Sequence, residues 1–230
     1  MGTIPDNVRH LRERVEAAAG RAGRAPEAVT IVAVTKTFGA DVVDRVIDCG
    51  IRDIGENRVQ EWLAKADAVR GECRWHLVGP LQRNKAGKVV GRVHLLQAID
   101  GVRIAETVDR IAGERGVRAA VLLEVNMSGE AAKHGVAPRE ALAAATELAG
   151  LEHIEFRGLM TVGPLEGGPD DTRRCFRRLR ALAEDARRAT GLALPELSMG
   201  MSDDFEMAIE EGATIIRVGR VITGERAAAG

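Results

Sequence analysis

The feature that most constrains the fold is a regular alternation of short apolar runs with polar turns and helical patterns. Eight such runs lie between residues 30 and 219. Runs rich in Val, Ile and Leu that are separated by helices are typical of parallel strands buried on both faces of a sheet. The runs are TIVAVT (30–35), IRDIG (51–55), RWHLVG (74–79), VHLLQAI (93–99), VRAAVLLEVN (117–126), EFRGLMTV (155–162), PELSMG (195–200) and TIIRVG (214–219).

Eight strand–helix units close naturally into a (β/α)8 barrel, and the 230-residue chain is near the usual size of that fold. The alternative is an open, doubly wound sheet. No GxGxxG motif follows the first run, which disfavours the dinucleotide-binding form of that alternative. No linker or low-complexity tract divides the chain. We therefore expect the α/β class, with one barrel domain over residues 1–230.

Helical patterns flank the apolar runs. Residues 6–22 place Val8, Leu11, Val15 and Ala18 at helical spacing, which predicts an extra N-terminal helix. Further stripes recur after the second run (Val59, Trp62, Leu63, Ala66) and after the fourth (Ile104, Val108, Ile111). Asp203, with Glu206 three residues later, predicts a helix start, and Asn57 is placed as a helix N-cap.

Composition and charge narrow the functional classes. Lys and Arg number 33 against 34 Asp and Glu, so global charge gives no support to binding of nucleic acid or a membrane surface. Cys49, Cys73 and Cys175 are far apart and form no CxxC pair, which argues against disulfides and a metal site. The N-terminus is polar, and no apolar run is long enough to span a bilayer. We expect a soluble, cytoplasmic monomer.

One arginine-rich segment needs a separate interpretation. Five arginines crowd a predicted helix and could contact nucleic-acid phosphates. Phe176, Leu179 and Leu182 interleave with them as an apolar stripe, so a solvated helix face is the preferred interpretation. The arginines are Arg173, Arg174, Arg177, Arg178 and Arg180.

Lys36 is the first candidate functional residue. Barrel active sites lie at the C-terminal ends of the strands, and the first run ends in Thr35-Lys36-Thr37. A lysine at the end of an apolar strand is expected to be partly desolvated, which lowers its pKa as Schiff-base chemistry requires. The alternative is a lysine that extends to the rim of the barrel.

The loops after the last two runs carry the pattern of a phosphate site. Barrels often bind phosphate with these loops and a helix start, through backbone N–H groups, hydroxyls and glycines. Gly200, Ser202 and Gly219 supply those groups. A phosphate clamp opposite a lysine indicates a phosphorylated aldehyde, for which pyridoxal phosphate and sugar phosphates both fit. By position alone, His76 reads as a core histidine and Lys133 as a solvated loop lysine.

At these residues the sequence resembles the pyridoxal phosphate homeostasis protein family and, more distantly, the barrel domain of alanine racemases. The resemblance runs from about residue 6 to 226. Seven segments taken together in this order carry it. They are VAVTK (32–36), IGENRVQE (54–61), WHLVGPLQRNK (75–85), LLEVNMSGEAAKHGV (122–136), FRGLMTVGP (156–164), LSMGMSDDFEMAIEEGAT (197–214) and IRVGRVITG (216–224).

The resemblance implies that pyridoxal 5′-phosphate (PLP) is the cofactor and that Lys36 carries it as a Schiff base. It implies that Ser202, with the backbone of Gly219 and Arg220, holds the phosphate. Many family members have a small hydroxyl residue at position 220, so Arg220 keeps the backbone donor but differs from them in its side chain.

The resemblance also assigns residues around the ring. It implies that Arg217 faces the pyridine nitrogen, which stays unprotonated because arginine does not readily give up its proton. Asn57 and His76 would line the pocket. Lys133 would meet the phenolic oxygen of the cofactor or compete for its aldehyde.

The same resemblance separates a carrier from an enzyme. Two-base racemisation needs a second acid–base group opposite the lysine, and in alanine racemases that group is a tyrosine on a separate domain. This chain contains no tyrosine. We therefore expect a PLP carrier without catalytic residues, which takes part in PLP homeostasis by supplying PLP-dependent apo-enzymes. A PLP-dependent amino-acid racemase of low activity is the alternative.

Overall fold

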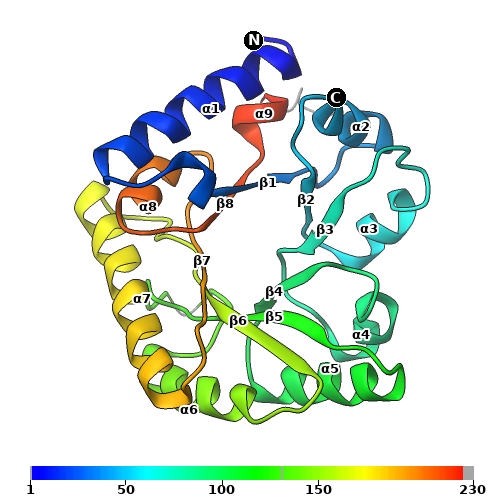
Figure 1. The fold of residues 1–230 in the computed structure, drawn as a ribbon, viewed down its shortest axis with the longest axis vertical. Coiled ribbons are helices and arrows are strands. Elements are labelled where there is room, and N and C mark those ends of the chain that lie inside the picture. Colours follow the sequence, from blue (N-terminus) through cyan, green and yellow to red (C-terminus); the bar gives the residue numbers. More distant parts are fainter. Residues whose placement is uncertain (1, 131, 225–230) are drawn as a thin grey trace.

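Eight parallel strands close into a barrel in chain order, from β1 to β8 and back to β1, in a computed structural model (Figure 1). The structure describes residues 2–130 and 132–224. The barrel confirms the predicted fold class and excludes the open doubly wound sheet. Of the domain expected over residues 1–230, residues 1, 131 and 225–230 lie outside the described residues.

The strands follow the apolar runs, with bounds that differ by a few residues. Hydrogen bonds join each strand to its neighbours, and β1 pairs with β8 through Thr30–Ala33 to complete the ring. The strands are β1 (Thr30–Val34), β2 (Asp53–Glu56), β3 (Arg74–Leu77), β4 (Leu95–Ile99), β5 (Ala119–Glu124), β6 (Ile154–Met160), β7 (Glu196–Ser198) and β8 (Ile215–Val218).

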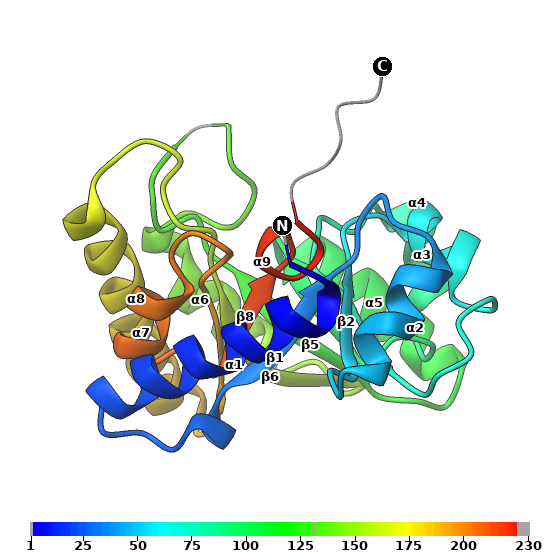
Figure 2. The same cartoon turned by 90° about the horizontal axis from the view of Figure 1, so that it is seen from above.

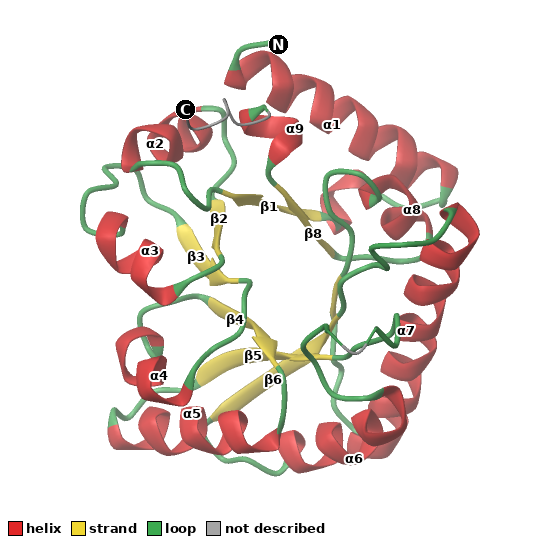
Figure 3. Cartoon of the chain, turned by 180° about the vertical axis from the view of Figure 1, so that it is seen from behind, coloured by secondary structure: helices red, strands yellow, loops and turns green. Residues whose placement is uncertain are grey.

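Helices surround the strand ring, as the view from behind shows (Figure 3). Among the described residues, none of them combines the length and apolar character needed to cross a membrane. The helices are α1 (Ile4–Arg21), the 3-10 turn η1 (Pro26–Ala28), α2 (Ala40–Asp48), α3 (Val59–Lys65), α4 (Arg83–Val89), α5 (Val102–Glu114), α6 (Pro138–Ala149), α7 (Pro169–Thr190), α8 (Phe205–Glu210) and α9 (Arg220–Thr223).

Helix α1 is the extra N-terminal helix, and it lies along α8 and α9 outside β8 and β1 (Figure 1). The predicted stripe of Val8, Leu11, Val15 and Ala18 is buried. Ion pairs join the polar side of α1 to α8, with Arg14 Nε 2.8 Å from a Glu206 carboxylate oxygen. The helix therefore covers the side of the barrel where the first and last strands pair.

Two apolar layers hold the barrel together. A large outer layer fills the space between strands and helices. A smaller cluster inside the ring contains Val32, Leu95, Ala98, Leu122, Met160 and Ile215. Because side chains alternate along a strand, inward-facing residues of β1 and β8 recur every second position towards the mouth. Lys36 and Arg217 stand in phase with Val32 and Ile215, which directs both towards the interior or mouth.

Two predicted helix starts are wrong by one residue. Arg58, not Asn57, is the N-cap of α3, because the chain stays extended through residue 58. Asp204, not Asp203, precedes α8, and its carboxylate accepts a hydrogen bond from the backbone N–H of Met201. Asp203 instead pairs with Arg220.

The arginine-rich helix α7 is balanced by acidic residues, as the preferred interpretation requires. Arg173 pairs with Glu210, and Arg177 pairs with Glu211 at a distance of 2.8 Å. Phe176 and Leu179 are buried beneath them. These arginines therefore tie α7 to α8.

Candidate functional site

Lys36 follows β1 at the C-terminal mouth of the barrel. It lines a cavity of about 480 Å³ together with Gly219 and Arg220, which follow β8. This hollow, which we call the Lys36 cavity, also includes Val34, Phe38, Thr223 and Gly224. The structure thus brings the predicted lysine beside the turn that follows the last strand.

The Lys36 side chain is exposed, which corrects the expectation that the strand end would desolvate it. The buried lysine near this strand end is Lys65 of α3. Its ammonium donates to the Thr35 carbonyl oxygen at 2.9 Å and to Glu56 Oε1 at 2.8 Å. The Thr35 hydroxyl also donates to Glu56 Oε1, at 2.6 Å. This network fixes the backbone immediately before Lys36.

The residue after Lys36 has an unusual backbone conformation. Thr37 has φ of 71°, in the left-handed region that a β-branched residue rarely adopts. Its backbone N–H donates to Glu61 Oε2 at 3.2 Å. Strained residues of this kind persist where surrounding contacts over-determine them, and they cluster at functional sites. The contacts of Thr35 with Lys65 and of Thr37 with Glu61 therefore fix the backbone on both sides of Lys36.

The predicted phosphate residues lie together. The Ser202 hydroxyl, after β7, accepts a hydrogen bond from the Gly219 N–H at 3.2 Å. A Cβ built on Gly219 would lie 3.0 Å from the Val34 carbonyl oxygen, so glycine allows this turn to approach β1 closely. Ser202 lines a smaller hollow of about 320 Å³ that shares Arg220 and Gly224 with the Lys36 cavity.

The Arg220 side chain lies at the surface, although the residue lines both hollows. It is exposed and pairs with Asp203 on the surface. The phosphate contact from the backbone of residue 220 stays a prediction.

Arg217 lies on β8 two residues before Gly219 and is buried. Its guanidinium donates to the Ser198 hydroxyl and, at 2.8 Å, to the Thr161 carbonyl oxygen. Burial lowers the pKa of Arg217 to about 10, while Glu124 and Asp204 oppose that shift. The side chain therefore stays charged at neutral pH and presents only donors.

His76 lies inside the barrel on β3, and both of its ring nitrogens have partners. Nε2 is 2.9 Å from Asp53 Oδ1, and Nδ1 is 2.9 Å from Gln97 Nε2. His76 is buried and lines none of the described cavities at the mouth. It has the surroundings of a satisfied core histidine, and its link to a cofactor stays a prediction.

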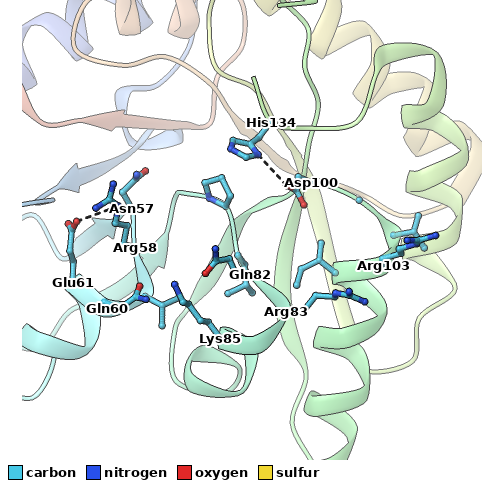
Figure 4. A pocket seen from close by; sticks show the side chains of 16 residues that line it. Asn57, Arg58, Gln60, Glu61, Gln82, Arg83, Lys85, Asp100, Arg103 and His134 are labelled. Carbon is cyan, nitrogen blue, oxygen red and sulfur yellow. Dashed lines mark ion pairs between the residues drawn. The ribbon is translucent and has the colours of Figure 1, made fainter. Parts of the chain in front are cut away.

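Asn57 lines a different hollow from that of Lys36 (Figure 4). This basic groove of about 1100 Å³ lies between the segments that follow β2, β3, β4 and β5. Asn57 is level with Lys36 by strand register, because Val34 pairs with Gly55 two residues earlier on each strand. The charged residues that line the groove are Arg58, Glu61, Arg83, Lys85, Asp100, Arg103 and His134.

Two carboxyls near Arg217, the buried Glu124 and the half-buried Asp204, were not predicted from the sequence. Glu124 ends β5, and its Oε2 has no hydrogen-bond partner among the described residues. Asp204 lies before α8. Burial raises the pKa of both groups, while Arg217 opposes the shift in each. A single acidic residue at the end of a long apolar run was the available signal for Glu124.

Lys133 is engaged in a loop contact. The loops after β5 and β6 stand side by side above the barrel (Figure 2). The Lys133 ammonium links the two loops. It donates to the Gly163 carbonyl oxygen at 2.6 Å and to Glu130 Oε1 at 3.0 Å. The solvated lysine predicted from position alone is therefore wrong, since Lys133 is mostly buried.

These residues fit a phosphorylated aldehyde by their chemistry. The Lys36 cavity lies within the range of about 300–1,000 Å³ that is typical of ligand pockets. It offers a primary amine and the Gly219 turn, and the Ser202 hydroxyl that contacts this turn lines the adjoining hollow. Arg217 contributes a fixed cation below the turn. Amine, hydroxyl and backbone donors are the groups that an aldehyde and a phosphate require.

The fold and site define a barrel of the alanine racemase type, and comparison with known proteins supports this. The chain belongs to the family described as alanine racemase, N-terminal domain, which matches residues 7–227. Alanine racemase of Clostridium difficile 630 has the same fold, with a TM-score of 0.75 and 17% identity. The match covers 96% of this chain and 57% of that one.

Within that family the chain falls among the pyridoxal phosphate homeostasis proteins. The protein of that name from Aquifex aeolicus (strain VF5) is 39% identical over 222 residues, which cover 96% of this chain and 97% of the relative. A structure of PipY from Synechococcus elongatus PCC7942 with PLP bound is 36% identical, with a TM-score of 0.81. That match covers 92% of this chain and 100% of PipY.

Proposed function

We propose that this chain binds PLP, carries it as a Schiff base on Lys36, and takes part in intracellular PLP homeostasis. The observation that carries the proposal is the Lys36 cavity, which places a lysine amine beside the Gly219 turn. The structure of the relative PipY with PLP bound supports PLP as the ligand, as do the relatives named pyridoxal phosphate homeostasis protein. PLP supplies an aldehyde that condenses reversibly with primary amines.

Each predicted residue has a role that its position supports. Lys36 provides the amine, and Ser202 with the Gly219 and Arg220 backbone provides donors for the phosphate. Arg217 stays charged and offers N–H groups to the ring nitrogen. Asn57, level with Lys36, borders the opening on the β2 side. His76 lies below the mouth and supports the pocket through its hydrogen-bond partners Asp53 and Gln97.

We infer that the main role is carriage, with delivery of PLP to PLP-dependent apo-enzymes. An exposed Lys36 is accessible to an incoming amine, which can displace the lysine and free the ligand. We further propose that the protein acts in the cytoplasm as a monomer, without nucleic-acid or membrane partners.

Absorbance spectroscopy tests the attachment site. Protein mixed with PLP is expected to show the visible band of a lysine-bound aldehyde, and borohydride is expected to remove it. Lys36→Ala should lack the band, while Lys85→Ala at the basic groove serves as a matched control and should keep it. A full band in Lys36→Ala would refute Lys36 and direct attention to Lys133.

A low-activity amino-acid racemase is the second candidate, and Glu124 is the observation that favours it. In the closed ring, β5 is the strand farthest from β1, so the buried Glu124 carboxyl stands across the mouth from Lys36. Chiral analysis after incubation with L-amino acids separates the candidates. A carrier produces no steady turnover. Turnover that Glu124→Gln abolishes would establish the enzyme instead.

A further inference from the structure

A hydrogen-bonded chain of polar side chains crosses the interior of the barrel below the mouth. It runs from Arg217 on β8 to Ser198 on β7, then to Gln97 on β4, His76 on β3 and Asp53 on β2. The three middle members are buried, with exposed fractions of 0%, 0% and 3% for Ser198, Gln97 and His76. Burying polar groups is costly unless each finds a partner, and here each does.

The direction of every hydrogen bond follows from the arginine. A guanidinium only donates, so the Ser198 oxygen accepts from Arg217. The Ser198 hydroxyl then donates to Gln97 Oε1 at 2.6 Å. That contact turns the Gln97 amide nitrogen towards His76 Nδ1, 2.9 Å away, which must accept.

The far end of the chain agrees with this direction. With Nδ1 as acceptor, the neutral His76 ring carries its proton on Nε2 and donates to Asp53 Oδ1 at 2.9 Å. Arg74 donates to the same carboxylate through both arms of its guanidinium, with Nε 2.7 Å from Oδ1. Although burial opposes it, these hydrogen bonds hold the pKa of Asp53 well below its usual range. An ionised acceptor therefore anchors the chain.

We propose that Ser198, Gln97, His76 and Asp53 are positioning residues that fix Arg217 at the mouth, and that they do so only while His76 is neutral. The inference rests on the proposed function, because it assigns to Arg217 the nitrogen of the bound ring. A protonated His76 would point Nδ1–H at the Gln97 amide hydrogens. Gln97 would then have to turn, and the Ser198 proton would lose its acceptor.

Other charged groups also face His76. Asp53 on β2 and Arg74 on β3 have been described. The ring of His94, just before β4, meets the His76 ring edge-on with centroids 5.4 Å apart. Burial lowers the pKa of His94, and the charge of Arg157 on β6, which is paired with Glu155, lowers it further. Only His76 contacts Gln97 among these groups, so His94 is the matched control histidine.

Nitrogen NMR of the wild-type protein tests the direction without PLP or any substitution. In ¹⁵N-labelled protein at about pH 8, His76 is expected to carry its proton on Nε2 and to show an unprotonated Nδ1. A proton on Nδ1 at that pH would overturn the proposal. Because this result does not involve Lys36, it remains separable from failure of PLP attachment.

A second experiment tests whether PLP binding depends on this chain of hydrogen bonds. It measures PLP affinity and the absorbance of bound PLP between about pH 8 and about pH 5, the range in which histidines titrate. Gln97→Leu interrupts the chain of hydrogen bonds. We expect PLP affinity to fall about tenfold at pH 8, a factor equivalent to about 1.4 kcal/mol. His94→Gln should behave like the wild type. Equal affinity in Gln97→Leu and the wild type would overturn the proposal.

Gln97→Glu provides a readout that a purely structural role would not produce. A carboxylate at position 97 accepts from both Ser198 and a His76 Nδ1–H, so it completes the chain with charged His76. The wild type is expected to lose affinity and shift its absorbance as the pH falls, whereas Gln97→Glu should retain both. Matching acid-side losses in the two proteins would refute the role of His76. If either variant does not fold, Ser198→Ala replaces it in the affinity comparison.

Discussion

Substitution of Lys65 by methionine tests how the protein fixes the end of β1. Lys65 and Glu56 have side-chain exposed fractions of only 8% and 0%, and the lysine makes two hydrogen bonds at 2.9 and 2.8 Å. Removing one partner of a buried pair costs about 3–5 kcal/mol, because the other charge stays buried. Methionine keeps most of the packing volume, so the loss of free energy is electrostatic.

The expected loss of folding free energy in Lys65→Met is large enough to measure. A loss of about 4 kcal/mol is a large share of the roughly 5–15 kcal/mol that stabilises a typical domain. For a chain of this length it lowers the melting temperature by roughly 8–16 °C. The assay is denaturant unfolding with two probes, fluorescence and circular dichroism, so that two-state behaviour is checked.

The pH dependence identifies the mechanism. Burial already raises the pKa of Glu56, and losing Lys65 raises it further. A carboxyl with a raised folded-state pKa stabilises the fold fully below its unfolded pKa and loses that contribution as pH rises through the folded pKa. Lys65→Met should therefore be more destabilised at pH 8 than at pH 5.

A double variant supplies the control. Glu56→Gln keeps an oxygen that can accept from the Thr35 hydroxyl. Adding it to Lys65→Met therefore removes both charges and leaves the Thr35 hydroxyl with an acceptor. We expect the double variant to recover most of the lost stability. A cost below about 1 kcal/mol for Lys65→Met, or no recovery in the double variant, would refute the reasoning.

Three further predictions concern single residues. Arg220→Ala should change stability and PLP affinity by less than about 1 kcal/mol in calorimetry, since its side chain pairs only with exposed Asp203. Gly158→Ala should cost about 3 kcal/mol in denaturant unfolding, because its Cβ would lie 1.9 Å from the Glu196 carbonyl oxygen. Asp53 has a lowered pKa, so the stability it contributes above its unfolded pKa is lost as pH falls. Asp53→Asn should therefore flatten the acid side of the stability curve below about pH 5.

The barrel and its mouth could be predicted because each rests on a local pattern. Short Val- and Ile-rich runs specify buried parallel strands, and strand ends specify the functional face. That logic placed Lys36 and Gly219 in one cavity. The same logic brought together the turns after β7 and β8, and in the structure Ser202 accepts a hydrogen bond from the Gly219 N–H.

The sequence could not show which polar residues pair inside the barrel. Gln97 and Ser198 are 101 positions apart in the chain, yet they form a 2.6 Å hydrogen bond. Contacts across a barrel depend on strand stagger, which no single run encodes. The exposure of Lys36 was also missed, since the buried lysine belongs to a helix packed behind the strand. The bounds of α3 and α8 were missed because local backbone geometry, not residue preference alone, sets each cap.

Peptide mapping after borohydride reduction is the most direct test of the account. The protein is loaded with PLP, reduced, digested and analysed by mass spectrometry, which identifies the lysine that carries the added mass. The structure predicts the added mass on the peptide that contains Lys36, beside the Gly219 turn. Added mass on the Lys133 peptide, with Lys36 unmodified, would contradict it.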